Sequence, residues 1–334
     1  MIETEDITVE VLSIKHKDIF KGVYYDFIRK SKKNYLFESE PLNYDDFFRS
    51  LENQNMTCLT ILENSIPTGF LAFNLTMTTS IEINILHLID SHNLELKVEL
   101  LFKSLFKLIK SSKEYANKAI SFPLVGVQKD YFEISKKLGF NFVSSSILNM
   151  YLNDDNVVNN YMNNYSDISL INGFKLKKWD DKYTSGTIKL IKEAFEGELD
   201  NLFDPRFKSI DGCSDIVEKI LKSIYGIFLP NVTQVLIKED NNEVCGICFL
   251  NLSTGSVANI PLMALKKDLR GQGLGLILLK SVLKELFMNI KSKLLFLNEV
   301  NVTANTDNFA AMNTYKKAGF KIYTEYPHIY INNC

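Results

Sequence analysis

The stretch Lys266-Lys-Asp-Leu-Arg-Gly-Gln-Gly-Leu-Gly275 stands between an apolar run over residues 257–265 and an apolar-periodic run over residues 276–287. We interpret this order as a strand, a glycine-rich turn and a helix. The beginning of a helix presents unpaired backbone N–H groups and the positive end of the helix dipole to an anion. Glycines let phosphate oxygens approach the main chain, and Arg270 adds positive charge beside them. The stretch therefore predicts a phosphate-binding loop.

Two better-known phosphate-binding loops can be tested against this spacing. The dinucleotide-binding pattern requires a third glycine at position 276, where Leu276 stands. The P-loop requires Gly-Lys where Leu276-Ile277 stands. Neither pattern fits, so the loop either binds another phosphate-bearing ligand or is a flexible turn between a strand and a helix.

The spacing of the loop resembles that of a known family. Arg270, Gly273 and Gly275 are similar to the acyl-CoA signature Arg/Gln-x-x-Gly-x-Gly/Ala of the GNAT superfamily of N-acetyltransferases. The Pro and Tyr that usually precede the Arg are replaced by Lys267 and Leu269. This departure is mild, because the residues that define the signature are all present.

A second stretch downstream strengthens this resemblance. Asn308-Phe-Ala-Ala311, Tyr315 and Gly319-Phe320 are similar to the family's Asn, Ala, Tyr and Gly-Phe spacing after the fifth strand. In that family the fourth and fifth strands splay apart, and the pantetheine arm of acetyl-CoA lies between them like an additional strand. The resemblance therefore implies acetyl-CoA as the cofactor and an amine of a small molecule or a peptide as the acceptor.

The resemblance also assigns the residues that contact acetyl-CoA. The main chain at the end of the fourth strand holds the pantetheine, the glycine loop holds the pyrophosphate, and the beginning of the next helix lies near the thioester. In this sequence these residues are Met263, Ala264 and Leu265, then Arg270, Gly271, Gln272, Gly273, Leu274 and Gly275, and finally Asn308 and Ala311.

Acyl transfer to an amine needs three chemical groups. A neutral amine attacks the thioester carbonyl, a backbone donor stabilises the oxyanion, and the departing thiolate takes a proton. Tyr315 stands where the family places the hydroxyl that faces the sulfur, so the resemblance makes it the general acid. The alternative for Tyr315 is an ordinary packed aromatic side chain.

The sequence offers no obvious general base. The fourth strand, residues 257–265, contains no Glu, Asp or His, although many family members keep a carboxylate there. Glu299, on or near the fifth strand, is the nearest alternative, and Asn301 and Asn305 are candidates for positioning the amine or a water. Two further candidates, on the closing hairpin, are His328 and the terminal carboxylate of Cys334.

The two halves of the chain resemble each other. Residues 57–75 parallel residues 233–252 as a strand, a polar turn and a second strand, and the Gly-Phe stretches 136–140 and 316–320 also match. We therefore predict an α/β protein of two tandem GNAT-like domains at residues 1–152 and 165–334, each a mixed sheet with helices on its faces. The Asn- and Asp-rich residues 153–164 predict a linker in turn conformation.

The first half lacks the residues of the second that carry chemistry. The positions that correspond to Arg270, Gly273 and Gly275 are Asn93, Leu96 and Val98. The positions that correspond to Asn308 and Tyr315 are Gln128 and Ser135. We therefore predict that the N-terminal domain is a degenerate, noncatalytic copy.

Composition bounds the remaining classes of function. The 334 residues carry 38 Lys and Arg against 40 Asp and Glu, a formal net charge of −2, which argues against a generally basic surface for nucleic acid or anionic membrane. No apolar run approaches a membrane span, and the acidic beginning is unlike a secretory signal.

The 5 scattered cysteines do not form a disulfide framework, and Cys245-Gly-Ile-Cys248 lacks a second metal-ligating pair. We expect a cytoplasmic monomer or homodimer that binds no metal, nucleic acid or membrane.

These observations favour an enzyme whose C-terminal domain transfers an acetyl group from acetyl-CoA to a primary amine by direct attack. An excess of acids over bases in residues 192–215 favours a cationic acceptor. A noncatalytic sensor of acyl-CoA is the main alternative. An aminoacyl-tRNA-dependent transferase is a weaker one, because it would need a basic surface and no CoA loop.

Overall fold

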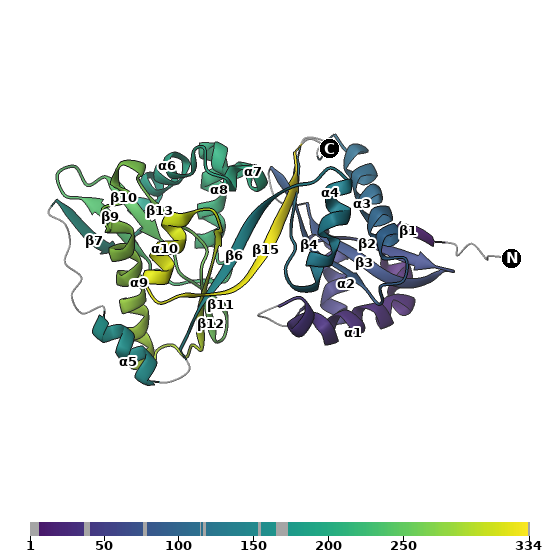
Figure 1. Cartoon of the computed structure of the whole chain (residues 1–334), viewed down its shortest axis with the longest axis horizontal. Coiled ribbons are helices and arrows are strands. Elements are labelled where there is room, and N and C mark those ends of the chain that lie inside the picture. Colours follow the sequence, from purple (N-terminus) through teal and green to yellow (C-terminus); the bar gives the residue numbers. More distant parts are fainter. Residues whose placement is uncertain are drawn as a thin grey trace. The chain divides into compact units, whose positions relative to one another are not determined.

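The computed structural model of the chain describes residues 7–36, 41–75, 79–113, 115, 118–152, 155–164 and 173–332. It is an α/β structure of mixed sheets with helices on their faces, as the sequence predicts (Figure 1). The chain forms two compact units. The N-terminal unit holds the residues up to Val143, Leu202–Pro205 and the residues from Tyr326 onward, and the C-terminal unit holds Ser144–Asn201 and Arg206–Glu325.

The N-terminal unit contains five strands up to β5 and four helices among its described residues. Its strands are β1 (Ile7–Val11), β2 (Thr57–Glu63), β3 (Ile66–Asn74), β4 (Ser80–Leu88) and β5 (Ala119–Pro123). Its helices are α1 (Lys17–Asn34), α2 (Tyr44–Glu52), α3 (Leu94–Lys110) and α4 (Phe132–Lys137). The strands follow the order β1-β2-β3-β4-β5, and β4 and β5 are parallel. An aliphatic cluster packs α3 on one face, and an aromatic cluster packs α1 and α2 through Phe20, Tyr24 and Phe70.

The rest of the chain repeats this succession with insertions, and Leu202–Pro205 and the end of its last strand belong to the N-terminal unit. Its strands are β6 (Asn141–Tyr151), β7 (Phe174–Lys178), β8 (Ile227–Phe228), β9 (Gln234–Lys238), β10 (Val244–Cys248), β11 (Asn251–Thr254), β12 (Val257–Ile260), β13 (Met263–Leu265), β14 (Glu299–Asn305) and β15 (Lys321–Ile331). Its helices are α5 (Asp155–Asn164), α6 (Thr184–Phe195), α7 (Asp200–Phe203), α8 (Ile210–Leu221), α9 (Leu274–Lys291) and α10 (Phe309–Lys317). Short 3-10 turns occupy Ile14–His16, Gly126–Tyr131, Asp181–Tyr183, Pro205–Lys208 and Lys267–Leu269.

Two sets of strands in the C-terminal unit share one core helix. The orders are β6-β14-β12-β11-β8 and β13-β10-β9-β7. The apolar face of α9 packs against strands of both sets, because leucines such as Leu278 and Leu279 lie in one buried cluster with Ile260, Val302 and Leu236. Helices α6 and α8 bury a second cluster against β9 and β10.

The closing strand of each half of the sequence pairs with a strand from the other half. Residues Ser145–Tyr151 of β6 pair with β14, which belongs to the C-terminal unit. His328–Ile331 of β15 pair with β5, which belongs to the N-terminal unit. The sequence analysis assigned each closing strand to its own half, because local patterns do not specify which of two similar sheet edges a strand joins.

The segment expected to be a linker contains a helix. Residues Asp155–Asn164 form α5, so the expectation of turns over residues 153–164 is wrong for the described part of that segment. Packing on α9 explains why this segment is helical. Val158 is buried, and the ring of Tyr161 stacks on Phe287 of α9 at 5.6 Å between ring centroids. Tertiary packing therefore outweighs the low helix propensity of asparagine.

Candidate active site

The strand predicted over residues 257–265 is two strands that belong to different sheets. β12 runs parallel to β14 until Ile260 pairs with Val302. Pro261 then interrupts the strand, and β13 pairs with β10 instead, while β14 continues to Asn305 beside β6. A proline cannot donate a ladder hydrogen bond, so it favours the break. β13 and β14 therefore diverge, as the family resemblance implied.

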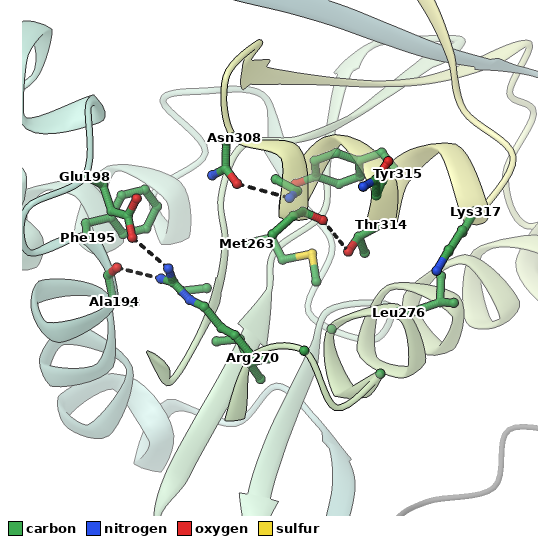
Figure 2. A pocket seen from close by; sticks show the side chains of 18 of the residues that line it. Ala194, Phe195, Glu198, Met263, Arg270, Leu276, Asn308, Thr314, Tyr315 and Lys317 are labelled. Atoms are coloured by element: carbon green, nitrogen blue, oxygen red, sulfur yellow. Dashed lines mark hydrogen bonds and ion pairs between the residues drawn. The ribbon is translucent and has the colours of Figure 1, made fainter. Parts of the chain in front are cut away.

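A cavity of about 320 Å³ lies at this divergence. It is lined by the end of α6 and the residues that follow it, by β13, by the glycine loop with the beginning of α9, and by α10 (Figure 2). Nearly all of the predicted cofactor residues line it: Met263, Ala264, Leu265, Arg270, Gly271, Gly273, Gly275, Asn308 and Ala311. Gln272 and Leu274 lie in the same loop but do not line the cavity, and Gln272 donates to the Asp268 carbonyl at 2.9 Å.

One edge of β13 carries main-chain groups that are free to bind a ligand. Ile247 of β10 pairs with Ala264, and hydrogen bonds from Phe249 N to Leu262 O and from Lys266 N to Cys245 O flank that pair. In an antiparallel ladder this pattern turns the N–H and C=O groups of the residues on either side of Ala264, Met263 and Leu265, away from β10. The divergence of β14 leaves that edge open to the cavity.

The glycine loop ends at an uncapped helix N-terminus. Gly271 and Gly273 have φ angles of +78° and +82°, and Gly273 is the N-cap of α9 without a side-chain hydrogen bond. A β-carbon at either glycine would meet no atom within 4 Å, so the positive φ angle, rather than lack of space, is what favours glycine. The first N–H groups of α9 therefore remain available for an anion.

Asn308 and Tyr315 are positioned by α10. The Asn308 side chain caps this helix by accepting a hydrogen bond from Ala311 N at 3.1 Å. Tyr315 is 6% exposed, lines the cavity and packs edge-on against Phe320. Burial raises the pKa of the Tyr315 hydroxyl above its ordinary value, and the nearby Cys248 and Asp200 raise it further. The phenol therefore stays protonated at neutral pH, as a general acid requires.

Arg270 points away from the helix N-terminus. Its guanidinium donates to Glu198 Oε1 at 2.6 Å and to the Ala194 carbonyl at 2.7 Å (Figure 2). Lys267 of the same loop donates to the Glu196 carbonyl. Two cations of the loop therefore bind the segment after α6, across the cavity from the glycines. This contact joins residues 72 positions apart, and local sequence patterns do not reveal it.

Three of the seven acids of residues 192–215 form ion pairs. Glu196 pairs with Lys192 at 2.9 Å, Asp215 with Arg206 at 3.2 Å, and Glu198 with Arg270. Asp200 lines the cavity together with Glu198. The excess of acids predicted to attract a cationic acceptor is therefore compensated in part within the structure.

The candidate bases lie outside the lining of the cavity. Glu299 begins β14, three residues before Val302, where the strands separate. His328 belongs to the N-terminal unit, where its ring stacks on Phe203 at 4.3 Å. Cys334 lies outside the described residues.

The N-terminal unit has the same opening, but its own side chains close it. β4 pairs with β5 only from Ser80 to Glu82, so these strands also diverge. Gln128 Oε1 accepts from Leu86 N at 3.0 Å on the exposed edge of β4. In the first turn of α3, the fully buried Lys97 pairs with Glu63 at 2.6 Å and Asp90 at 3.2 Å. Gln128 therefore occupies the strand edge that corresponds to the open edge of β13.

The lining includes residues that the sequence analysis missed. On α10, Ala310, Thr314 and Lys317 follow helical spacing beside the predicted Ala311 and Tyr315, so periodicity could have indicated them. The others are Ala194, Phe195, Glu198, Asp200, Leu276 and Asn313.

The described residues contain neither a group that could hold a metal ion nor a helix that could cross a membrane. Within residues 7–332, apart from the gaps given above, His, Cys, Asp and Glu side chains do not assemble into a group that could hold a metal ion. Cys245 and Cys248 are both buried. The described helices are each too short or too polar to cross a membrane.

Comparisons with known proteins agree with this geometry. Residues 231–322 match the family model of the acetyltransferase (GNAT) domain. No curated protein sequence matches the chain significantly. A GCN5-related N-acetyltransferase from Sphaerobacter thermophilus superposes with a TM-score of 0.63 at 10% identity, over 98% of this chain and 95% of the other.

Two further solved structures share the fold. A tandem GNAT protein from the clavulanic acid biosynthesis pathway has a TM-score of 0.58 at 12% identity, over 98% of this chain and 99% of the other. A glucosamine N-acetyltransferase region of a fungal multi-domain β-N-acetylglucosaminidase has a TM-score of 0.63 at 12% identity, over 99% of this chain and 38% of the other. Residues 231–322 thus resemble the acetyltransferase (GNAT) domain, and the chain has the fold of a tandem GNAT protein.

Proposed function

We propose that the chain transfers an acetyl group from acetyl-CoA to a primary amine at the cavity of the C-terminal unit. One observation carries the proposal: an open strand edge, an uncapped helix N-terminus and a buried tyrosine line the same cavity of about 320 Å³. The strand edge suits an extended amide-containing arm, and the helix N-terminus suits a diphosphate.

The residues present fit the coenzyme in chemical type. Main-chain groups of Met263 and Leu265 would hold the pantetheine, and the N–H groups that follow Gly273 would hold the diphosphate. Acetyl-CoA, when bound, supplies the acetyl group as an activated thioester. Arg270 would hold the glycine loop in place through the ion pair between its guanidinium and Glu198.

The chain's own groups supply the remaining chemistry. The amine attacks the carbonyl carbon, the C–N bond forms, and a main-chain N–H on the open edge of β13 stabilises the oxyanion. The C–S bond then breaks, and Tyr315 gives its proton to the sulfur. Solvent returns a proton to Tyr315, and the amine nitrogen loses one.

A sensor of acyl-CoA without turnover is the second candidate function. It is favoured by the absence of Glu, Asp and His from β12 and β13, where a carboxylate could take the amine's proton. The acceptor under the first proposal is a small molecule or a peptide with a primary amine.

Release of free CoA with a panel of amines separates these functions. Acetyl transfer predicts amine-dependent CoA release by the wild type, together with binding of acetyl-CoA in calorimetry. Binding without CoA release for every amine would support the sensor. Absence of binding would contradict both functions.

A further inference from the structure

The turn that ends α10 is built around a glycine. Residues 318–320 connect α10 to β15, and Gly319 in their middle has a φ angle of +102°, which favours glycine. Phe320 N donates to the Tyr315 carbonyl at 3.1 Å and closes the helix. The turn is therefore hydrogen-bonded directly to the backbone of the proposed general acid.

A tyrosine of α5 lies against this glycine. Tyr161 donates its hydroxyl proton to the Gly319 carbonyl at 3.3 Å. A β-carbon at Gly319 would lie 2.5 Å from Cε1 of Tyr161, so the ring occupies the space that any other residue would need for its side chain. The same ring stacks on Phe287 of α9 at 5.6 Å between centroids. Tyr161 therefore contacts both α9 and the end of α10.

The contact continues from Gly319 to Tyr315. Phe320 directly follows Gly319, and its ring packs edge-on against Tyr315 at 5.8 Å between centroids. Tyr161 packs against the hydrophobic cluster that contains both of these rings. A shift of Gly319 would therefore reach Tyr315 in two ways, through the backbone hydrogen bond of Phe320 and through the ring of Phe320.

The N-terminal unit has the same turn without such a tyrosine. Gly139 follows α4 with a φ angle of +90°, and Phe140 N donates to the Ser135 carbonyl at 3.1 Å. A β-carbon at Gly139 would meet one described atom within 4 Å, Cδ1 of Ile331 at 3.9 Å, which is an ordinary contact. The turn itself therefore forms without an aromatic ring on its glycine. Ser135 stands where the other copy has Tyr315, so the ring accompanies the copy with the proposed acid.

The proposed reaction makes the position of Tyr315 important. Its hydroxyl has to come within hydrogen-bond reach of the departing sulfur. A misplacement of about 1 Å can slow such a step by about 100-fold. Gly319 lies four residues after Tyr315, about one helical turn, so a displacement at the end of α10 reaches the acid over a short distance.

We propose that Tyr161 is a positioning residue that fixes the end of α10 and thereby places the Tyr315 hydroxyl for proton transfer to the departing sulfur. This inference rests on the proposed acetyl transfer and adds no covalent step to it. Tyr161 does not line the cavity, so it acts through α10. The segment between the two repeats, through α5, then takes part in the function of the C-terminal unit.

Removal of the Tyr161 ring should lower kcat and leave coenzyme binding nearly unchanged. Tyr161→Ala frees the end of α10, so we expect kcat to fall by about tenfold or more, within the range that misplacement of a catalytic group causes. The dissociation constant of acetyl-CoA in calorimetry should change little, because the glycine loop and β13 keep their contacts. Tyr161→Phe keeps the ring against Gly319 and loses one long hydrogen bond, so its kcat should lie close to the wild-type value.

A double-mutant cycle in the full-length chain separates positioning from a general structural role. If Tyr161 acts through the Tyr315 hydroxyl, Tyr161→Ala should lower kcat much less in the Tyr315→Phe background than in the wild type. An equal factor in both backgrounds would show that Tyr161 does not act through Tyr315 and would overturn the inference. Wild-type kcat in Tyr161→Ala would overturn it as well.

Gly319→Ala approaches the same contact from the other side, and Gly139→Ala is its matched control. Both glycines have positive φ angles, so the backbone strain is similar, but only at Gly319 does the new methyl group meet the Tyr161 ring. Gly319→Ala should lower kcat by about tenfold or more, and Gly139→Ala should leave it unchanged. Equal kcat values for these two variants would contradict the inference alone. Absence of CoA release by the wild type with every amine would overturn the proposed function, and the role of Tyr161 with it.

Discussion

Tyr315 combines burial with a place in the lining of the cavity, and both properties matter for an acid. Its ring packs edge-on against Phe320, and the residue lines the cavity. Its raised pKa keeps the proton available throughout the neutral range.

Removing this hydroxyl should slow the chemistry more than it weakens binding. We expect Tyr315→Phe to lower kcat by about 100-fold or more, because the thiolate then leaves without a proton donor. The dissociation constant of acetyl-CoA should change little, since the ring and its packing remain. Steady-state kinetics and calorimetry on the same preparation measure both quantities. A variant with the full wild-type kcat at all pH values would show that Tyr315 is a packed aromatic.

His87 of the N-terminal unit makes stability depend on pH. It is 0% exposed, its Nδ1 lies 2.7 Å from the Tyr35 hydroxyl, and its Nε2 lies 3.2 Å from Asp26 Oδ2. Burial lowers the pKa of His87 from 6.5 to about 4. Between these values the unfolded chain binds the proton that folded His87 excludes, so stability falls as the pH decreases.

We expect the free energy of unfolding to decrease between about pH 6.5 and 4, with His87 contributing on the order of 3 kcal/mol. Urea denaturation at several pH values measures this change. His328, whose pKa burial lowers to about 3, adds a change of the same sign. His87→Gln keeps a polar side chain but cannot titrate, so its stability should vary less with pH. An unchanged slope in that variant would contradict the assignment.

At the residue scale, the local sequence was enough to indicate some residues of the site and not the contacts of others. Gly273 and Asn308 were singled out by the family resemblance, and the structure places them at the N-caps of α9 and α10. The direction of the Arg270 side chain was not predictable, since Glu198 reaches it only through the tertiary fold. The sequence indicated that the first half lacks the loop residues of the second, but it did not indicate the contact of Gln128 with Leu86 or the ion pairs of Lys97.

Among the elements, α9 matters most because its N-terminus is the proposed anion site. The positive φ angles of Gly271 and Gly273 set the direction of the N–H groups there. A side chain at either position strains the backbone by roughly 1–2 kcal/mol. The loop would relieve this strain by turning its N–H groups away from the ligand.

Gly273→Ala should therefore weaken acetyl-CoA binding by about 5- to 30-fold, which corresponds to that strain. Calorimetric titration of the full chain measures the dissociation constant. Gly255→Ala is the matched control, because that glycine lies in open space and has no positive φ angle. Equal affinities for both variants would mean that the loop does not bind the coenzyme.

The boundaries of the elements show where sequence patterns fail. Helix α9 was predicted almost to its observed ends, because its apolar positions recur every three or four residues over Leu274–Lys291. The predicted fourth strand over residues 257–265 proved to be β12 and β13, and Pro261 between them was the available signal. Helix α5 was not predicted, because its few apolar residues stabilise it only by packing on α9 in the tertiary structure.

At the scale of the whole molecule, the chain repeats one fold and uses the two copies differently. In the N-terminal unit, Gln128 hydrogen-bonds to the edge of β4, and Lys97 in the first turn of α3 pairs with Glu63 and Asp90. The C-terminal unit leaves the corresponding strand edge open. The pairing of β15 with β5 could not be predicted, because local patterns do not specify which sheet edge a strand joins.

This difference predicts the stoichiometry of coenzyme binding. Titration of the full-length chain with acetyl-CoA should give about one site per chain, since only the C-terminal copy combines a glycine loop with an open strand edge. Calorimetry and equilibrium dialysis both report this number. Two sites per chain, or one site unaffected by Gly273→Ala, would show that the N-terminal unit binds the coenzyme.

The central claim is that main-chain N–H groups at the beginning of α9 bind the diphosphate of acetyl-CoA. A crystal structure of the full-length chain with this coenzyme tests it most directly. We predict diphosphate oxygens within hydrogen-bond distance of the main-chain nitrogens of residues 271–276, and the pantetheine along Met263–Leu265. Coenzyme bound at α3 of the N-terminal unit, or a glycine loop left empty while the coenzyme binds elsewhere, would contradict the account.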